Sequence, residues 1–214
     1  MDGAKGRWHG GDASQALYNL QCASQQGKGG DAHHNRERAT EVIMAQHLET
    51  GRVQIYTGDG KGKTTAALGL AFRAMGYGLD VLVLQFSKRL RCSEHEAGER
   101  FGMPIEQATA ATPELCARQI MDRAFEALSP TGGADGTAPV DVLVLDELGS
   151  AMGRGFVTRA DVEALVAARP ETTELVLTGR GLLDLADLAD LVTEMRPVKH
   201  YFDEGLLARK GIEY

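Results

Sequence analysis

Short, continuous runs of apolar residues recur along the chain from residue 52 onward. A strand with one solvated face alternates apolar and polar positions, whereas continuous runs are typical of a parallel sheet that helices cover on both faces. The pattern predicts strands within RVQIYT (52–57), DVLVLQF (80–86), VDVLVLDEL (140–148), TELVLTGR (173–180) and LADLVTEMRPV (188–198).

Segments of helical composition separate these runs, at residues 63–78, 113–128 and 159–169. Strands that alternate with helices imply βαβ units, so we expect an α/β fold with a mostly parallel central sheet in three layers. Two polar segments, 88–100 and 129–139, are expected to be solvated loops. The first follows a strand at the carboxyl edge of the sheet, where open α/β folds bind ligands, so it could also cover a substrate.

The N-terminal part of the chain differs from the rest in composition. Residues 1–34 are rich in Gly, Gln, Ser, Ala and His, which predicts a flexible arm. Residues 35–50 have an amphipathic pattern and precede the first strand, so we expect an N-terminal helix that serves as an arm or a lid. Residues 51–214 are then the folded domain.

Composition excludes several partners. The chain of 214 residues has 23 Lys and Arg against 30 Asp and Glu, and its net charge of -7 argues against nucleic acid or an anionic membrane. Its three cysteines have no paired spacing, which indicates reduced thiols. No signal peptide is recognisable, and no run approaches the roughly 18–20 apolar residues that span a bilayer. A cytoplasmic protein is expected.

The sequence TGDGKGKTT, residues 57–65, joins the first predicted strand to the first predicted helix. The usual phosphate-binding loop, G-x-x-x-x-G-K-[ST], would have its first glycine at position 57. This chain has Thr57 there and its glycine at Gly58, so the loop is one residue short.

The loop nevertheless has the chemistry of a nucleotide site. Its glycines let successive N–H groups point at phosphate oxygens, and the start of a helix favours negative charge. Lys63 supplies a full positive charge, and the Thr64 hydroxyl can bind Mg²⁺. The predicted ATP-binding residues are Gly58, Asp59, Gly60, Lys61, Gly62, Lys63, Thr64 and Thr65.

Acidic residues end one of the buried strands. Asp146 and Glu147 follow VLVL at the carboxyl end of that strand, where P-loop proteins hold their magnesium. Together with Thr64 they are the candidate metal ligands. The sequence CSEH, residues 92–95, offers two soft ligands, which do not complete the four-ligand shell of structural zinc. We therefore predict no zinc site there.

These motifs resemble the P-loop class of corrinoid adenosyltransferases, from about residue 35 to Tyr214. The most specific parts are the shortened loop and the segment RPVKHYFDEGLLARKGIEY, residues 196–214. The resemblance implies a P-loop NTPase-like (RecA-like) fold. It also implies transfer of the 5′-deoxyadenosyl group of ATP to the Co(I) of a corrinoid, in adenosylcobalamin biosynthesis or salvage, with release of triphosphate.

The same resemblance implies roles for particular residues and partners. ATP would bind in the reverse of the usual P-loop direction, with Lys63 and Glu147 as the catalytic residues and Thr64 with Glu147 on Mg²⁺. The family also forms homodimers, with an N-terminal helix over the active site. A flavodoxin-like or flavin reductase would supply the electrons.

The sequence departs from that family on the corrinoid side. Family members usually carry KG-W--GE after the second strand and a GFTW-like segment further on, whose aromatics crowd the lower face of the corrin and displace its axial base. Here the matching segments read SKRLRCSEHEAGER and QATAATPELCARQ, and the only tryptophan is Trp8. This predicts a substrate without a lower base, reduced activity or a changed role.

Two alternatives remain from the sequence. A P-loop phosphotransferase or ATPase would place the γ-phosphate at the lysine, and the missing loop residue speaks against it. A non-catalytic homologue that binds ATP or corrinoid would keep the scaffold without turnover.

Overall fold

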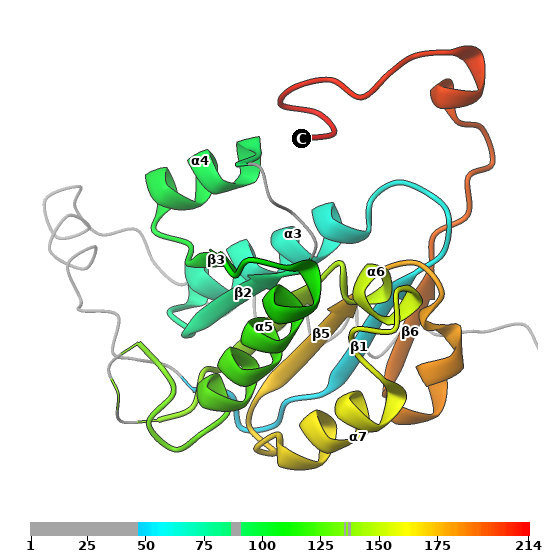
Figure 1. Cartoon of the computed structure of the whole chain (residues 1–214). Helices are drawn as coiled ribbons and strands as arrows, with labels where there is room; N and C mark the ends of the chain where they lie inside the picture. The colour runs from blue at the N-terminus through cyan, green and yellow to red at the C-terminus, as the bar shows by residue number, and fades with distance from the viewer. Residues whose placement is uncertain (1–46, 87–90, 135, 137) are drawn as a thin grey trace, which may run out of the picture. The chain divides into compact units, whose positions relative to one another are not determined.

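The structure is a computed structural model that describes residues 47–86, 91–134, 136 and 138–214. In this part of the chain, six strands form one sheet in the order β3-β2-β4-β5-β1-β6, and every neighbouring pair is parallel (Figure 1). The strands are β1 (Val53–Thr57), β2 (Val81–Gln85), β3 (Ile105–Gln107), β4 (Val142–Asp146), β5 (Glu174–Thr178) and β6 (Leu191–Glu194). The helices are α3 (Lys63–Tyr77), α4 (Ser93–Phe101), α5 (Pro113–Ala127), α6 (Leu148–Gly153) and α7 (Arg159–Ala168), with 3₁₀ turns η1 (Leu182–Leu188) and η2 (Tyr201–Glu204).

This topology confirms the predicted α/β, P-loop-like fold. The strand that leads into the glycine loop, β1, and the strand that ends in Asp146, β4, are separated by β5, as in RecA-like folds. Because all pairs are parallel, the carboxyl ends of these three strands meet at one edge of the sheet. The topology therefore brings the loop and the acidic residues to the same edge.

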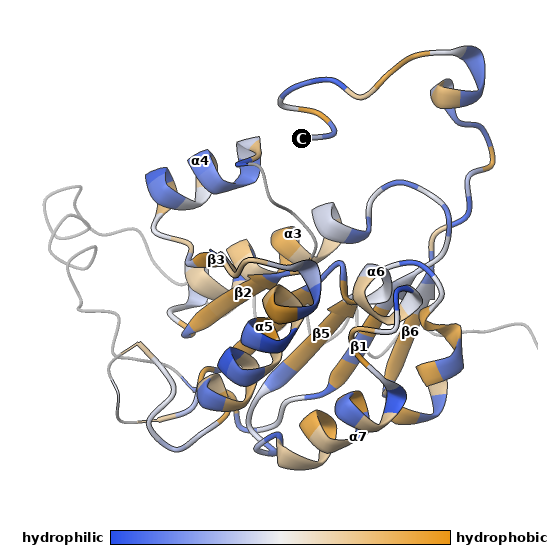
Figure 2. Ribbon diagram, in the orientation of Figure 1, coloured by the Kyte–Doolittle hydropathy of each residue, from blue (hydrophilic) through white to orange (hydrophobic). Residues whose placement is uncertain are grey.

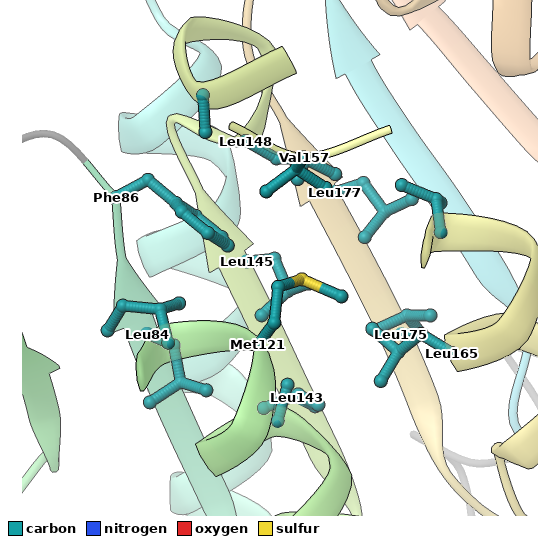
Figure 3. Close-up of a cluster of buried hydrophobic side chains, with 14 of the residues drawn as sticks. Leu84, Phe86, Met121, Leu143, Leu145, Leu148, Val157, Leu165, Leu175 and Leu177 are labelled. Carbon is teal, nitrogen blue, oxygen red and sulfur yellow. The ribbon is translucent and has the colours of Figure 1, made fainter. Parts of the chain in front are cut away.

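One face of the sheet is built largely from leucine. In β4, Leu143 and Leu145 point to this face, and they pack in a buried cluster with Met121 from α5 and Leu165 from α7 (Figure 3). Leu148, the first residue of α6, lies at the end of the same cluster next to the carboxyl edge. The large side chains fill the space between the sheet and these helices.

The opposite face carries valine in place of leucine. Val142 and Val144 of β4 belong to a second buried cluster with Val83, Val176 and three small side chains of α3. Those small side chains are Ala67, Ala71 and Ala74. Spacings of four and three residues put them on one side of the helix, and alanine lets the helix lie close to the sheet. Helix α3 begins at Lys63, so this packing also fixes the end of the glycine loop.

The structure confirms most of the predicted elements and corrects two of the predictions. The five predicted strands are present, and the sheet gains the three-residue β3, which was not predicted. The prediction that residues 88–100 form a loop is wrong where Ser93–Phe101 forms α4, whose polar outer face is visible in Figure 2. The described residues of 129–139 form turns and bends, as expected.

The expected arm (1–34) and most of the expected helix (35–50) lie outside the described residues. Residues 47–50, the described end of that segment, are not helical, and the Leu48 N–H donates to the Asp141 carboxylate at 3.2 Å. In the described ranges, no helix is both long and apolar enough to cross a bilayer.

Candidate active site

The glycine loop runs between β1 and α3 and is braced from one side by the chain that follows β6. The Gly60 N–H donates to the Met195 carbonyl oxygen at 2.7 Å. A Cβ atom added to Gly58 would lie 2.5 Å from that oxygen, and one added to Gly60 would lie 2.7 Å from it. Gly58 also has φ 95, a value that side chains disfavour. Glycine is required here because the short loop curls directly against Met195.

Lys63 lies inside this curl. Its Nζ donates to the carbonyl oxygens of Gly58 at 2.8 Å and Gly60 at 2.9 Å, and the residue is 9% exposed. Burial lowers the pKa of the Lys63 ammonium below its ordinary value, and the charge of Arg180 lowers it further. The loop thus surrounds a buried cation, which an anionic ligand would stabilise.

Asp146 connects the loop to the sheet. It is fully buried at the end of β4, and one carboxylate oxygen accepts from the hydroxyls of Thr64 at 2.8 Å and Thr178 at 2.7 Å. The other oxygen accepts from the Gln85 amide at 3.0 Å. The Thr64 hydroxyl therefore directs its hydrogen toward Asp146, which leaves the lone pairs of its oxygen for another partner.

Glu147 adopts a backbone conformation that is unusual for its type. With φ 61, it is the one non-glycine residue of positive φ within the described ranges. Its N–H donates to the Thr178 hydroxyl at 3.0 Å, and helix α6 begins at the next residue. Such strain costs about 1–3 kcal/mol and is concentrated at functional sites. Here it turns the chain so that Glu147 lines a pocket that Asp146 does not reach.

That pocket has a volume of about 850 Å³, within the range of small-molecule sites. Every predicted ATP-binding residue except Gly58 lines it. Gly58 contributes instead through its carbonyl oxygen, which binds Lys63. The other lining residues are Leu68 of α3, Ser93 and Glu94 of α4, Glu147, Gly149 and Ser150 after β4, Arg180 after β5, and His200, Gly211, Ile212, Glu213 and Tyr214 near the C-terminal end.

A family model described as ATP:corrinoid adenosyltransferase BtuR/CobO/CobP matches residues 49–214. The corrinoid adenosyltransferase CobA of Salmonella typhimurium is 38% identical over 183 residues, which cover 84% of this chain and 93% of that protein. This chain belongs to the ATP:corrinoid adenosyltransferase family. The corrinoid adenosyltransferase of Escherichia coli is 35% identical with the same coverage, and that of Pseudomonas aeruginosa is 35% identical over 81% of this chain and 89% of its own length. The predicted enzyme class is therefore confirmed.

In this adenosyltransferase, the sequence patterns missed the part of the site that comes from other strands and from the C-terminal end. Thr178 and Gln85 donate hydrogen bonds to Asp146, but each lies in a different apolar run of the sequence. Their closeness to Asp146 could be predicted only with knowledge of the strand order. Arg180 lies 3.9 Å from Asp59 in an exposed ion pair at the pocket. Its signal in the sequence was a charged residue two positions after a buried strand, similar to the acidic residue at the end of a buried strand that pointed to Asp146.

Helix α4 replaces the expected loop at one side of the adenosyltransferase pocket. Cys92, Glu94 and His95 offer ligand atoms within 4.8 Å of one another, so the third potential ligand, Glu94, was missed from the sequence. However, Nδ1 of His95 accepts the Cys92 N–H at 3.0 Å, which caps the first turn of α4. Nδ1 of His95 thus has a structural role at the start of α4.

Proposed function

We propose that this adenosyltransferase holds the triphosphate of ATP in the glycine loop while a corrinoid Co(I) attacks the ribose C5′ carbon. One observation carries the proposal: the buried Lys63 ammonium, the Thr64 hydroxyl held by Asp146, and Glu147 meet at a single pocket, which Lys63, Thr64 and Glu147 line. Lys63 would offset charge on the triphosphate, and the main-chain N–H groups of the loop would bind its oxygens.

The reaction needs no general base. The Co(I) electron pair forms the Co–C5′ bond, and the C5′–O bond breaks with its electrons passing to the triphosphate, which leaves whole. Co(I) is already a strong nucleophile, so the protein has to align cobalt, C5′ and the leaving oxygen and to stabilise the leaving charge. A short loop braced by Met195 supports the reversed direction of ATP, since a tighter curl offers fewer inward N–H groups to a β,γ unit.

The residues present fit a magnesium ion. Thr64 and Glu147 would hold it, because both line the pocket and both offer oxygen, the ligand atom that Mg²⁺ prefers. Bound there, Mg²⁺ would neutralise charge on the triphosphate oxygens. Asp146 accepts hydrogen bonds from Thr64, Thr178 and Gln85 and does not line the pocket, so it would position the Thr64 hydroxyl rather than bind the ion itself.

The direct test is to supply chemically prereduced cob(I)alamin, ATP and Mg²⁺ and to follow the spectrum of the adenosylated product together with the phosphorus products. We expect one intact tripolyphosphate for each Co–C bond, with little ADP or orthophosphate. ADP formed in step with the cobalt product would support a phosphotransferase in its place. Binding of ATP and corrinoid without turnover would mean a non-catalytic homologue.

Two finer proposals concern partners. We propose that the enzyme forms a homodimer and that a flavodoxin-like or flavin reductase supplies its electrons. Sedimentation of the purified protein tests the first, and a monomer at micromolar concentration would contradict it. Turnover from Co(III) corrinoid with each reductase in place of a chemical reductant tests the second, and the absence of turnover with both would contradict it.

A further inference from the structure

The C-terminal tail, defined here as residues 199–214, forms the wall of the pocket that faces the glycine loop. His200, Ile212 and Tyr214 line the pocket from this side, whereas Lys61 and Lys63 line it from the loop. Figure 1 shows the tail leaving β6, passing over the carboxyl edge and ending near the start of α4. The two walls differ in chemistry, because the tail offers aromatic and apolar side chains together with the Glu213 carboxylate, whereas the loop offers the cations Lys61 and Lys63.

Three contacts attach the tail to the rest of the site. The Lys61 Nζ donates to the Ile212 carbonyl oxygen at 2.9 Å and lies 3.4 Å from the Glu213 carboxylate. The Ser93 hydroxyl donates to the main-chain oxygen of Tyr214 at 2.8 Å. Lys61 is part of the loop and Ser93 begins α4, so the tail bridges both sides of the pocket.

Glu213 is the centre of the contacts that hold this tail in shape. Its carboxylate accepts from the Tyr201 hydroxyl, from the Arg209 N–H at 2.7 Å and from the Arg209 guanidinium at 3.2 Å, in addition to its ion pair with Lys61. The Arg209 guanidinium also lies 5.2 Å from the centre of the Tyr201 ring. The hydrogen bonds from Arg209 and Tyr201 lower the pKa of Glu213 to about 2, so the carboxylate is ionised at any assay pH.

We propose that the C-terminal tail holds the adenosine part of ATP. Glu213 is the positioning residue that keeps the tail against the glycine loop. The inference rests on the proposed function, which places the triphosphate at the loop. Adenosine is joined covalently to that triphosphate, so it lies in the same pocket, one wall of which is the tail. A flat, uncharged purine suits the aromatic and apolar side chains of the tail, whereas phosphate does not.

Steady-state kinetics of Glu213→Gln tests the proposal, with prereduced corrinoid and ATP varied separately. The substitution keeps the shape of the side chain and removes its charge. We expect the KM for ATP to rise about three- to tenfold with kcat within about twofold, since hydrogen bonds to charge and a part-exposed ion pair are weakened. Tyr201→Phe, which removes a single hydroxyl donor, should shift the KM for ATP in the same direction by less.

Glu204→Gln is the matched control, because Glu204 lies in the same tail and pairs with Lys199 at 2.9 Å, outside the Glu213 contacts. Its KM for ATP should equal that of the wild type. A rise in the KM for the corrinoid with the KM for ATP unchanged would assign the tail wall to the corrinoid and overturn the proposal. Unchanged values for both substrates would also overturn it.

Trypsin cleavage after Arg209 and Lys210, followed by mass spectrometry, gives a readout that does not depend on turnover. ATP should protect these two bonds in the wild type, tripolyphosphate should protect them less because it lacks the adenosine, and Glu213→Gln should lose most of the protection. Equal protection by ATP and tripolyphosphate would contradict a wall that holds adenosine. If the wild type forms no Co–C bond, the proposed function fails, whereas an active wild type with an unaffected Glu213→Gln refutes this inference alone.

Discussion

The two walls of the pocket are built in different ways. On the loop side, Lys63 is 9% exposed and Asp146 is fully buried, and their partners come from the loop, α3, β2 and β5. On the tail side, Arg209 remains 47% exposed, and Lys61, the loop residue that the tail contacts, remains 39% exposed; these contacts are made within the tail or between the tail and the surface of the loop. The loop wall thus belongs to the core, whereas the tail wall is attached to it.

This difference predicts different consequences of mutation. Buried hydrogen bonds shared among several strands are lost only when the core opens, whereas a segment held by solvent-exposed polar contacts can open by itself at low cost. Substitutions on the loop side should therefore change the rate of the chemical step or the stability of the fold. Substitutions on the tail side should change nucleotide binding and leave the fold intact.

The largest effect is expected for Lys63→Ala. It removes the buried charge that we propose offsets the leaving triphosphate, and the loss of one such group costs about 10²–10³-fold in kcat. Turnover with prereduced cob(I)alamin at saturating ATP measures it. Lys199→Ala, which changes a lysine that is 80% exposed in the tail, is the control and should retain wild-type kcat. A decrease below about tenfold in Lys63→Ala would remove this residue from the catalytic role.

Asp146→Ala, on the loop side, should destabilise the fold more than a substitution in the tail does. The donors of Thr64, Thr178 and Gln85 lose their acceptor, so the free energy of unfolding should fall by about 2–4 kcal/mol. Glu213→Ala, whose ion-pair partners Lys61 and Arg209 are 39% and 47% exposed, should melt at the wild-type temperature. Equal loss of melting temperature in the two variants would mean that the tail is part of the cooperative core.

Glu147→Gln should act on the metal rather than on the fold. Gln keeps the size of the side chain but is a weaker ligand, so the Mg²⁺ concentration for half-maximal rate should rise about tenfold. A Mg²⁺ titration of the initial rate measures this shift, with Glu163→Gln, on the exposed side of α7, as the control. An unchanged Mg²⁺ requirement would show that Glu147 does not bind the ion.

A smaller effect is expected on the corrinoid side. Without the lower-face aromatics of the family, the enzyme should use the Co(II) form of cobinamide, which has no coordinated base, a few-fold faster than cob(II)alamin under a weak reductant. With prereduced Co(I) the difference should shrink, because the axial base has already left. Equal rates for the two Co(II) substrates would show that other residues displace the base.

The sequence was informative where a segment is buried on two sides. The runs around Val144 and Val176 could be placed as strands because burial demands apolar side chains at every position. Helix α4 was missed because charged residues dominate it, and its cap from His95 to Cys92 uses residue types that rarely cap helices. The three residues of β3 are only half-buried, too short and too mixed to show a pattern.

The residues of the site could be predicted where they lie in a local sequence motif, but not where the strand order brings them together. Lys63 and Thr64 lie in a motif whose spacing is local, so their place at the pocket could be expected from the sequence. Thr178 and Gln85 could not, because their approach to Asp146 depends on the order of three strands. The tail was recognised by resemblance alone, since Glu213 and its partners are held together by exposed polar contacts that leave no periodic pattern.

The most direct test of the two-wall account compares kcat and the KM for ATP in Lys63→Ala and Glu213→Gln under identical conditions, with prereduced cob(I)alamin as the acceptor. The account predicts that Lys63→Ala loses about 10²–10³-fold in kcat, whereas Glu213→Gln keeps its kcat and loses affinity for ATP. A Glu213→Gln enzyme whose kcat falls as far as that of Lys63→Ala would contradict the separation of a catalytic wall from a binding wall.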